Sequence, residues 1–430
     1  MTNYLWFKRK ILIKMYDNNY MFKFIEDICN EIGPRESGTE QEILAGNRVE
    51  SELKKFCDET HQESYTSSPH AFLGGIRYGV ILVFIAGVFF WVSLLTDLSI
   101  IVLNPTFNFL FLVLAIVLIV VCVSYFILEV MKYHETFDFL FPKRESNNII
   151  GTINPKNEVR NTIIFSAHHD SAFEFNTFYY LKRFGQIIIN VGYLGVAIMS
   201  IAIILKLTFF LLSIEQPILF LVFGIFFIFF IPIIIVYIFF HSYKPVLGAF
   251  DNLSGVAILL GIAKFLSENK KDTEIFPNYT RVHFISFAGE EAGLRGAKRY
   301  VKAHYNELAS NQTTVVNMDS IAKKDFIVIH NKESGIGARH DPIVFERILD
   351  IAENLNLNAK LLPLPFGATD GAVFSKKNIP TVSIGGLNLK EELLPYYHTR
   401  NDTPDVIEKE ALGQFAQVCV EYLKLVDNQS

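Results

Sequence analysis

The chain has 430 residues, of which 51% are hydrophobic, 14% aromatic and only 19% charged. This composition excludes a disordered chain, and it is too apolar for an ordinary soluble enzyme, in which about 25% of residues are charged. The net charge of −5 gives no basic surface of the kind that nucleic-acid-binding proteins show, so nucleic acid is not expected as a partner.

The first residues carry a basic group at Lys8, Arg9 and Lys10 but no apolar run of signal-peptide length. We therefore expect no cleaved secretion signal, with Met15 and Met21 as alternative start positions. The four cysteines of the chain lie far apart and form no CxxC pair. This argues against a disulfide framework and against a thiolate zinc site.

Four uncharged runs stand out, each about the 17–25 residues with which a helix crosses the roughly 30 Å hydrocarbon core of a bilayer. They are Tyr78–Leu95, Phe107–Leu128, Ile187–Leu205 and Pro217–Phe240. Buried strands are shorter, about 4–8 residues. Pro232 inside the fourth run is compatible with a membrane helix, in which neighbouring groups satisfy the freed carbonyl. The sequence therefore predicts four transmembrane helices.

The four runs form two pairs, each joined by 11 residues, and each pair is expected to be a transmembrane hairpin. The three polar parts of the chain then lie on one side of the membrane. Lys206 is the one basic residue of the two connections on the far side, whereas seven basic residues flank the runs on the near side: Arg77, Lys132, Lys143, Arg144, Lys182, Arg183 and Lys244. The positive-inside rule therefore favours a cytoplasmic location for the three polar parts.

Outside the hairpins, short strand-like runs alternate with amphipathic helical segments. The predicted strands are Thr162–Ala167, Val282–Phe287, Thr314–Met318, Phe326–His330 and Thr381–Ile384, and the predicted helices are Ser254–Glu268, Leu294–Leu308 and Glu410–Val426. This alternation predicts an α/β fold with a mostly parallel sheet covered by helices on both faces. One domain would consist of residues 16–74, 131–184 and 242–430, interrupted by hairpins at 75–130 and 185–241.

Histidines and carboxylates follow the predicted strands, where ligands of such sheets bind. His168 ends the first strand, Glu290 and Glu291 follow the second, and Asp319 ends the third. Taken singly, each motif is more simply explained as a turn or a solvated helix start. Together with Asp251 and His398 of two further loops, His168, Glu291 and Asp319 supply two histidines and three carboxylates, the ligand set of a two-metal hydrolase.

The motifs also resemble those of a known family. In chain order, HHDS, GAFDNLSG, FAGEEAGLRGAKRY, NMDS and YYHTRNDTPD are similar to the motifs of the zinc aminopeptidases of peptidase family twenty-eight, and IGPRESGTEQEILAGNRVESEL resembles its N-terminal helix signature. The resemblance covers about residues 20–70, 145–180 and 245–428. Five motifs in the same order are far more specific than any one of them.

The resemblance implies a site with two divalent metal ions. His168 and Asp319 would hold one ion, Glu291 and His398 the other, and Asp251 would bridge them. Nitrogen and oxygen donors without thiolate suit Zn²⁺, with Mn²⁺ or Co²⁺ as substitutes. Two such ions bridged by hydroxide would make a nucleophile available near neutral pH.

Neighbouring residues receive roles on the same basis. Glu290 would be the general base, which takes the proton of the attacking water and delivers it to the leaving amine. Asp170 would accept the ring N–H of His168, and His169 would be structural. Tyr397 would donate to the oxyanion or serve packing alone. Asp402 is expected to cap the last helix rather than to bind metal.

The chain departs from familiar membrane-bound members, because both hairpins interrupt the catalytic domain instead of preceding or following it. Only 10 residues (241–250) separate the second hairpin from Asp251, and they span at most about 36 Å. The metal site is therefore expected near the membrane surface. Its substrates would be short apolar peptides, such as remnants of membrane proteins.

Several functions remain open beside an aminopeptidase. A carboxypeptidase differs only in pocket residues that the motifs do not reveal. A glutaminyl cyclase would use one zinc ion, and its relatives usually have serine where this chain has Asn252. A non-catalytic scaffold is disfavoured because every ligand position is kept, and a transporter because the four runs contain no acidic or basic side chain and no histidine.

Overall fold

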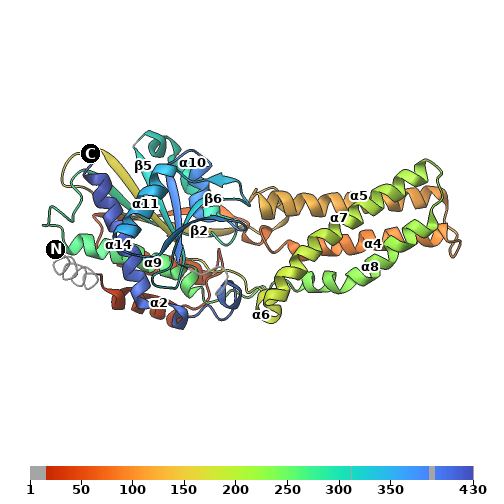
Figure 1. Ribbon diagram of the computed structural model, residues 1–430, viewed down its shortest axis with the longest axis horizontal. Helices are drawn as coiled ribbons and strands as arrows, with labels where there is room; N and C mark the ends of the chain where they lie inside the picture. Colours follow the sequence, from red (N-terminus) through yellow and green to blue (C-terminus); the bar gives the residue numbers. More distant parts are fainter. Residues whose placement is uncertain (1–15, 311, 387–392, 430) are drawn as a thin grey trace. The chain divides into compact units, whose positions relative to one another are not determined.

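The computed structural model describes residues 16–310, 312–386 and 393–429 (Figure 1). The expectations about the first 15 residues lie outside this range. The chain forms two compact units: unit 1 comprises residues 1–69, 141–174 and 244–430, and unit 2 comprises residues 70–140 and 175–243. Unit 2 is thus two insertions in the sequence of unit 1.

Unit 1 is built on a nine-stranded sheet with the order β1-β2-β4-β3-β5-β9-β6-β7, in which β8 pairs with β6. The strands are β1 (Glu59–Ser67), β2 (Arg144–Ile153), β3 (Asn161–His168), β4 (Thr280–Phe287), β5 (Thr313–Ile321), β6 (Ile327–Glu333), β7 (Ala338–Arg339), β8 (Ala359–Leu364) and β9 (Thr381–Gly386). The central strands β4, β3, β5 and β9 run parallel. Antiparallel pairs extend the sheet towards both edges.

Helices cover both faces of this sheet. Helices α3, α9, α11 and α14 contact strands on one face, and α10 and α12 on the other. The helices of unit 1 are α2 (Asn18–Glu31), α3 (Glu40–Leu53), α9 (Ser254–Glu268), α10 (Arg295–Ser310), α11 (Pro342–Asn354), α12 (Asp370–Ser375), α13 (Leu393–Tyr396) and α14 (Lys409–Asp427). The predicted α/β class is therefore confirmed.

Two long helical hairpins make up unit 2. Its helices are α4 (Ile76–Asp97), α5 (Pro105–Tyr125), α6 (Asn176–Leu181), α7 (Arg183–Leu211) and α8 (Pro217–Ile238), with short helical turns η1 (Pro69–Ala71), η2 (Phe126–Met131) and η3 (Asp138–Leu140). Helices α4, α5, α7 and α8 pack as a bundle with its own apolar core. Proline at the first turn suits α5 and α8, because its fixed φ is helical and the missing N–H has no partner there. As predicted, α8 continues through Pro232.

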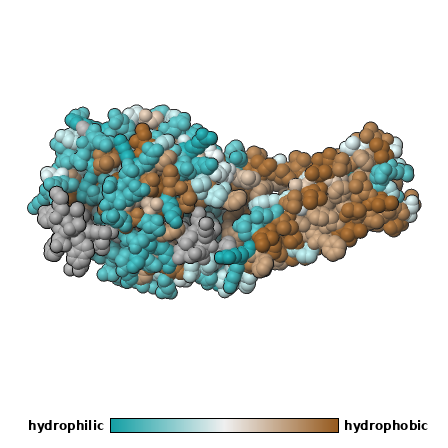
Figure 2. Space-filling view, in the orientation of Figure 1, coloured by the Kyte–Doolittle hydropathy of each residue, from teal (hydrophilic) through white to brown (hydrophobic). Residues whose placement is uncertain are grey.

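Five helical segments are long and apolar enough to cross a membrane. Four of them contain α4, α5, α7 and α8, whose most apolar windows are only 22–39% buried within the protein. The surface of these helices is dominated by hydrophobic residues (Figure 2). The fifth segment, Ala249–Glu268, contains α9 and is 94% buried, so it is a core helix of unit 1.

Candidate metal centre

The predicted metal ligands come from three adjacent strand ends and two loops. His168 is the last residue of β3, Glu291 follows β4, and Asp319 lies near the end of β5. These three strands are parallel neighbours, so their carboxyl ends meet at one edge of the sheet. Asp251 belongs to the irregular turn η4 (Ala249–Leu253) before α9, and His398 to the turn after α13.

Asp251 lies between the two histidines. Its Oδ1 is 3.4 Å from Nε2 of His168, and its Oδ2 is 3.3 Å from Nε2 of His398. Oε1 of Glu291 is 3.1 Å from the same nitrogen of His398. Two ligand atoms that each lie about 2.0–2.2 Å from a tetrahedral metal ion are about 3.4 Å from one another.

The donor atoms form two groups that share Asp251. One contains His168, Asp251 and Asp319, and the other contains Asp251, Glu291 and His398. Within each group the donor atoms lie within 4.8 Å of one another. A third group joins Glu290 to His168 and Glu291. The structure thus brings all five predicted ligands together, and the nitrogen and oxygen donors fit zinc.

The centre has a surplus of buried negative charge. Burial and the nearby Asp251 raise the pKa of Asp319 to about 7. Burial also raises the pKa of Glu290 well above its usual value, against the opposing charge of His168. Burial alone would lower the pKa of His398, but the Glu291 and Asp251 carboxylates raise it to about 10. Carboxylates crowded in this way are stabilised by cations, as a metal centre requires.

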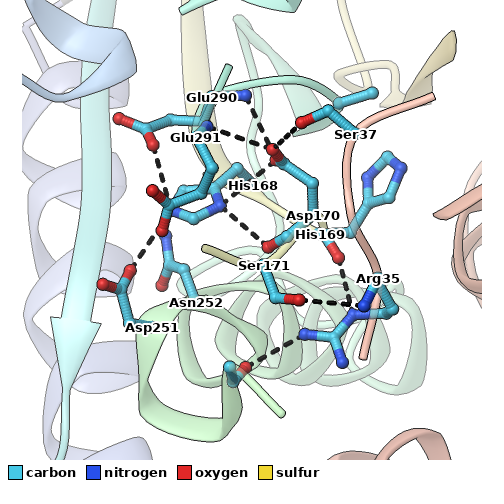
Figure 3. A network of polar contacts seen from close by, with 12 residues as sticks. Arg35, Ser37, His168, His169, Asp170, Ser171, Asp251, Asn252, Glu290 and Glu291 are labelled. Atoms are coloured by element: carbon cyan, nitrogen blue, oxygen red, sulfur yellow. Dashed lines mark hydrogen bonds and ion pairs between the residues drawn. The ribbon is translucent and has the colours of Figure 1, made fainter. Parts of the chain in front are cut away.

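Asp170 connects the first histidine to the loop after β4 (Figure 3). Nδ1 of His168 lies 3.4 Å from Oδ1 of Asp170 and 3.3 Å from its backbone carbonyl oxygen. The same Oδ1 accepts a hydrogen bond from the backbone N–H of Glu290 at 3.1 Å. Its Oδ2 accepts from the Ser37 hydroxyl at 2.6 Å and from the backbone N–H of Glu291 at 3.0 Å. One buried carboxylate therefore contacts the imidazole ring of His168 and binds the backbone of both glutamates, which fixes their relative positions.

Arg35, which sequence reasoning missed, connects the loops that carry His168 and Asp251. The fully buried guanidinium donates to the carbonyl oxygens of His169 (2.7 Å), Leu247 (2.7 Å) and Gly248 (3.1 Å). The backbone N–H of Arg35 donates to the Ser171 hydroxyl at 2.8 Å (Figure 3). The motif IGPRESG contains this arginine, but its acceptors are backbone carbonyls, which leave no signal in a sequence.

The prediction for Asp402 is wrong. The N-cap residue of α14 is Glu408, whereas Asp402 is fully buried and accepts hydrogen bonds from the backbone N–H groups of Phe250 (2.8 Å) and Asp251 (3.3 Å). It stabilises the ligand loop instead of the helix. His169 is structural, as predicted, because it is buried and its Nδ1 lies 2.9 Å from the Ser286 hydroxyl.

Two further predicted residues lie in or beside the ligand loops. The side-chain amide of Asn252 donates to the carbonyl of Met318 at 2.9 Å and accepts from the N–H of Gly255 at 3.2 Å, so it joins η4 to β5 and α9. The ring of Tyr397 stacks on that of His398 with centroids 3.8 Å apart. Burial raises the pKa of Tyr397 well above its usual value, and the charge of Asp251 adds to this. The phenol is therefore a neutral donor beside the metal ligands.

Comparisons with known proteins agree with this geometry. Residues 236–423 match the family model of peptidase family M28. Aminopeptidase YwaD of Bacillus subtilis (strain 168) is 31% identical over 172 residues, which are 39% of this chain and 35% of the relative. The chain thus spans about a third of the length of that curated relative. Every predicted ligand except His168 lies within the matched residues.

Solved structures share the fold. BSAP, a zinc aminopeptidase from Bacillus subtilis, superimposes with a TM-score of 0.54 at 15% identity, over 96% of this chain and 95% of that one. A glutaminyl cyclase from an Acidobacteriales bacterium does so with a TM-score of 0.54 at 11% identity, over 96% of each chain. The family model thus matches the part of unit 1 that contains Asp251, Glu291, Asp319 and His398, and the solved structures share the fold.

Proposed function

We propose that the chain is a membrane-integral aminopeptidase that uses two zinc ions. The observation that carries the proposal is the position of Asp251, whose two carboxylate oxygens each face a histidine of a different ligand group. The family match of residues 236–423 and the likeness to aminopeptidase YwaD support the same reaction.

Each residue around the ligands would have a separate role in the reaction. When bound, the metal ions polarise the scissile carbonyl and lower the pKa of water. Glu290 takes the proton of the attacking water and passes it to the leaving amine. Asp170 fixes the ring of His168 and, through two backbone N–H groups, the position of Glu290. Tyr397 donates to the oxygen on which negative charge develops.

Unit 2 would anchor the enzyme in the bilayer as two transmembrane hairpins. This follows from the length, apolar character and low burial of α4, α5, α7 and α8. Lys206, the basic residue assigned to the far side, is ion-paired with Asp97 and contributes little net charge there. The remaining asymmetry of basic residues favours a cytoplasmic catalytic unit. Short apolar peptides, including fragments of membrane proteins, are the expected substrates.

An assay of the purified full-length protein tests the proposal. We expect hydrolysis of aminoacyl-anilides with a free N-terminus and none of N-acetylated analogues, loss of activity with a chelator, and recovery with zinc. Metal analysis should give close to two zinc ions per chain. A zinc-loaded protein that cleaves neither substrate would refute the aminopeptidase assignment.

The same preparation separates the competing functions. A carboxypeptidase would cleave peptides with a blocked N-terminus. A glutaminyl cyclase, the activity named for one structural neighbour, would cyclise N-terminal glutamine with one zinc ion per chain. A scaffold would hold no zinc.

A further inference from the structure

Asp370, the first residue of α12, is a buried carboxylate without a hydrogen-bond partner in the described part of the chain. Its exposure is 1%, and both carboxylate oxygens are unsatisfied. Other buried carboxylates of unit 1 are paired: Asp170 and Asp402 accept backbone N–H groups, and Glu333 accepts from His340 and Thr369. A buried polar group that lacks a partner is costly and requires an explanation.

The backbone of Asp370 is fixed from both sides. The preceding Thr369 donates its N–H and its hydroxyl to Glu333, at 2.8 and 2.7 Å. The following Gly371 lies so close to β5 and β9 that a Cβ atom there would be 2.3 Å from the Ser383 hydroxyl and 3.1 Å from Cβ of Asn317. The backbone at the start of α12 is therefore fixed by its neighbours, and this fixes the position of the Asp370 carboxylate.

Helix α12, which begins at Asp370, packs against β3 and β5, the strands that carry His168 and Asp319, so Asp370 lies near the metal centre but outside its ligand groups. Burial raises the pKa of its carboxyl well above the usual value; the charge of His168 opposes this, and those of Asp170 and Asp319 add to it. None of the three groups of potential ligands found among the described residues includes Asp370. Burial favours the neutral form of this carboxyl, so its ionised form requires a cation close by, and none of the described residues hydrogen-bonds to it.

We propose that Asp370 binds the α-ammonium group of the peptide substrate. The inference rests on the proposed aminopeptidase function and extends it to substrate recognition. In an aminopeptidase the ammonium group is two bonds from the scissile carbonyl carbon, so its partner must lie next to the metal centre. A fixed, buried and unpaired carboxylate in that place forms a charge-assisted hydrogen bond with an ammonium group and offers nothing to the carboxylate of a C-terminus.

The test compares two ligands that differ only in the ammonium group. L-Leucine and 4-methylpentanoate are titrated into the zinc-loaded full-length protein, and their affinities are measured by calorimetry. For Asp370→Asn we expect the affinity for leucine to fall by about 10–100-fold, as for the loss of one hydrogen bond between charged groups. The affinity for 4-methylpentanoate should change less than about twofold, because that ligand makes no such bond.

Controls distinguish recognition from structure. Asp350→Asn, which changes an exposed aspartate on α11, should alter neither affinity. If Asp370→Asn does not fold, Asp370→Glu keeps the charge at a changed distance and should still lower leucine affinity selectively. Equal losses for both ligands, or none, would overturn the role of Asp370. Failure of the wild-type protein to cleave any free-amine substrate would instead refute the proposed function itself.

Discussion

Helices α9 and α8 are both long and apolar, but they bury their side chains in different ways. The window containing α9 has a mean hydropathy of 1.5 and is 94% buried, whereas that of α8 has a mean hydropathy of 3.2 and is 28% buried. Glycines let α9 lie close to its neighbours: a Cβ at Gly255 would be 2.8 Å from Cβ of Ala167. Helix α8 instead exposes Ile225, Ile228 and Phe229.

The difference shows what hydropathy does and does not decide. Length and apolar character select both helices as able to cross a bilayer. The two helices differ in the surfaces that they pack against, because α9 packs against strands of the sheet, whereas α8 packs against α4 and α7 and leaves its other face exposed. Apolar surface left exposed on this scale marks contact with lipid or with another protein.

An aspartate substitution in each helix should have different effects on stability, because α9 is buried and α8 is partly exposed. Leu259→Asp puts a charge at a fully buried position of α9, and we expect a loss of more than about 4 kcal/mol in the free energy of unfolding in any solvent. Ile228→Asp, at a half-exposed position of α8, should leave stability in detergent nearly unchanged. In a bilayer it should cost about 2.5–3.5 kcal/mol. Thermal unfolding in micelles and in nanodiscs measures both effects.

Ile343→Asp is the matched control, since Ile343 is an exposed apolar residue of α11 in unit 1. It should be neutral in micelles and in nanodiscs. If Ile228→Asp behaves like Ile343→Asp in nanodiscs, the exposed face of α8 does not contact lipid.

The substitution Glu290→Gln should affect turnover in unit 1 but not the insertion of unit 2 into a bilayer. It removes the proposed proton acceptor without removing a proposed ligand, so turnover should fall by about 10²–10⁴-fold. Zinc content and insertion into nanodiscs should remain at wild-type levels. Hydrolysis of leucine anilide, with metal analysis of the same sample, measures the effect.

An exposed glutamate gives the control, because Glu274→Gln makes the same substitution at the surface of unit 1 and should keep full activity. A zinc-loaded Glu290→Gln protein with wild-type turnover would remove Glu290 from the mechanism. Loss of zinc in this variant would make it a ligand instead.

Much of the fold follows from periodicity. All five strands predicted from short β-branched runs are present, and the prediction of helix Ser254–Glu268 matches α9 to the residue. Four strands were not predicted from the sequence: β1 is mostly polar, β2 begins with five polar residues, β7 has only two residues, and the run of β8 contains Pro363. Strand β1 has the sequence ETHQESYTS, and its pairing with β2 rests on backbone hydrogen bonds that any side chain permits.

The site was predictable where side chains meet the metal and unpredictable where they meet the backbone. His168, Asp251 and the other ligands are recognisable by residue type and place. Arg35 and Asp402 bind carbonyl and N–H groups of the ligand loops, and such contacts depend on loop paths that only the folded chain determines. The error over Asp402 has this origin, since a helix cap and a loop anchor have the same residue type.

Within unit 2, Gly195 of α7 allows a close approach to α8. A Cβ atom at Gly195 would lie 2.0 Å from the ring of Phe230, which is buried. Gly195→Ala should therefore cost about 1–3 kcal/mol in bundle stability, the usual range for overpacking. Hydrogen exchange of α7 and α8 measures this, while α9 and metal content should be unaffected.

Val191→Leu serves as the control for added volume. Val191 lies on the same helix with an exposed side chain, so the extra methylene meets no neighbour within the protein. Equal destabilisation by the two variants would contradict close packing at Gly195.

The smallest expected effect is a dependence of the stability of unit 1 on pH, which arises from His283 on β4. Burial, with the charges of Arg281, His61 and His304, lowers the pKa of His283 on β4 to about 4, while its Nδ1 lies 2.9 Å from the Thr152 hydroxyl. The folded state thus favours the neutral ring, and as pH falls below the unfolded value of about 6.5 the unfolded chain takes up the proton first.

The contribution of His283 is therefore complete above that value and declines as pH falls towards the folded pKa. Between pH 7 and 5.5 it should remove about 1 kcal/mol of stability. His283→Gln keeps a polar side chain near Thr152 but cannot titrate, so hydrogen exchange of β2 and β4 should depend less on pH in this variant. The helices of unit 2 provide the internal reference, since exchange there should respond equally in both proteins. An unchanged pH dependence of β4 would assign the acid sensitivity of unit 1 to other groups, with the carboxylates and histidines of the metal centre as the next to test.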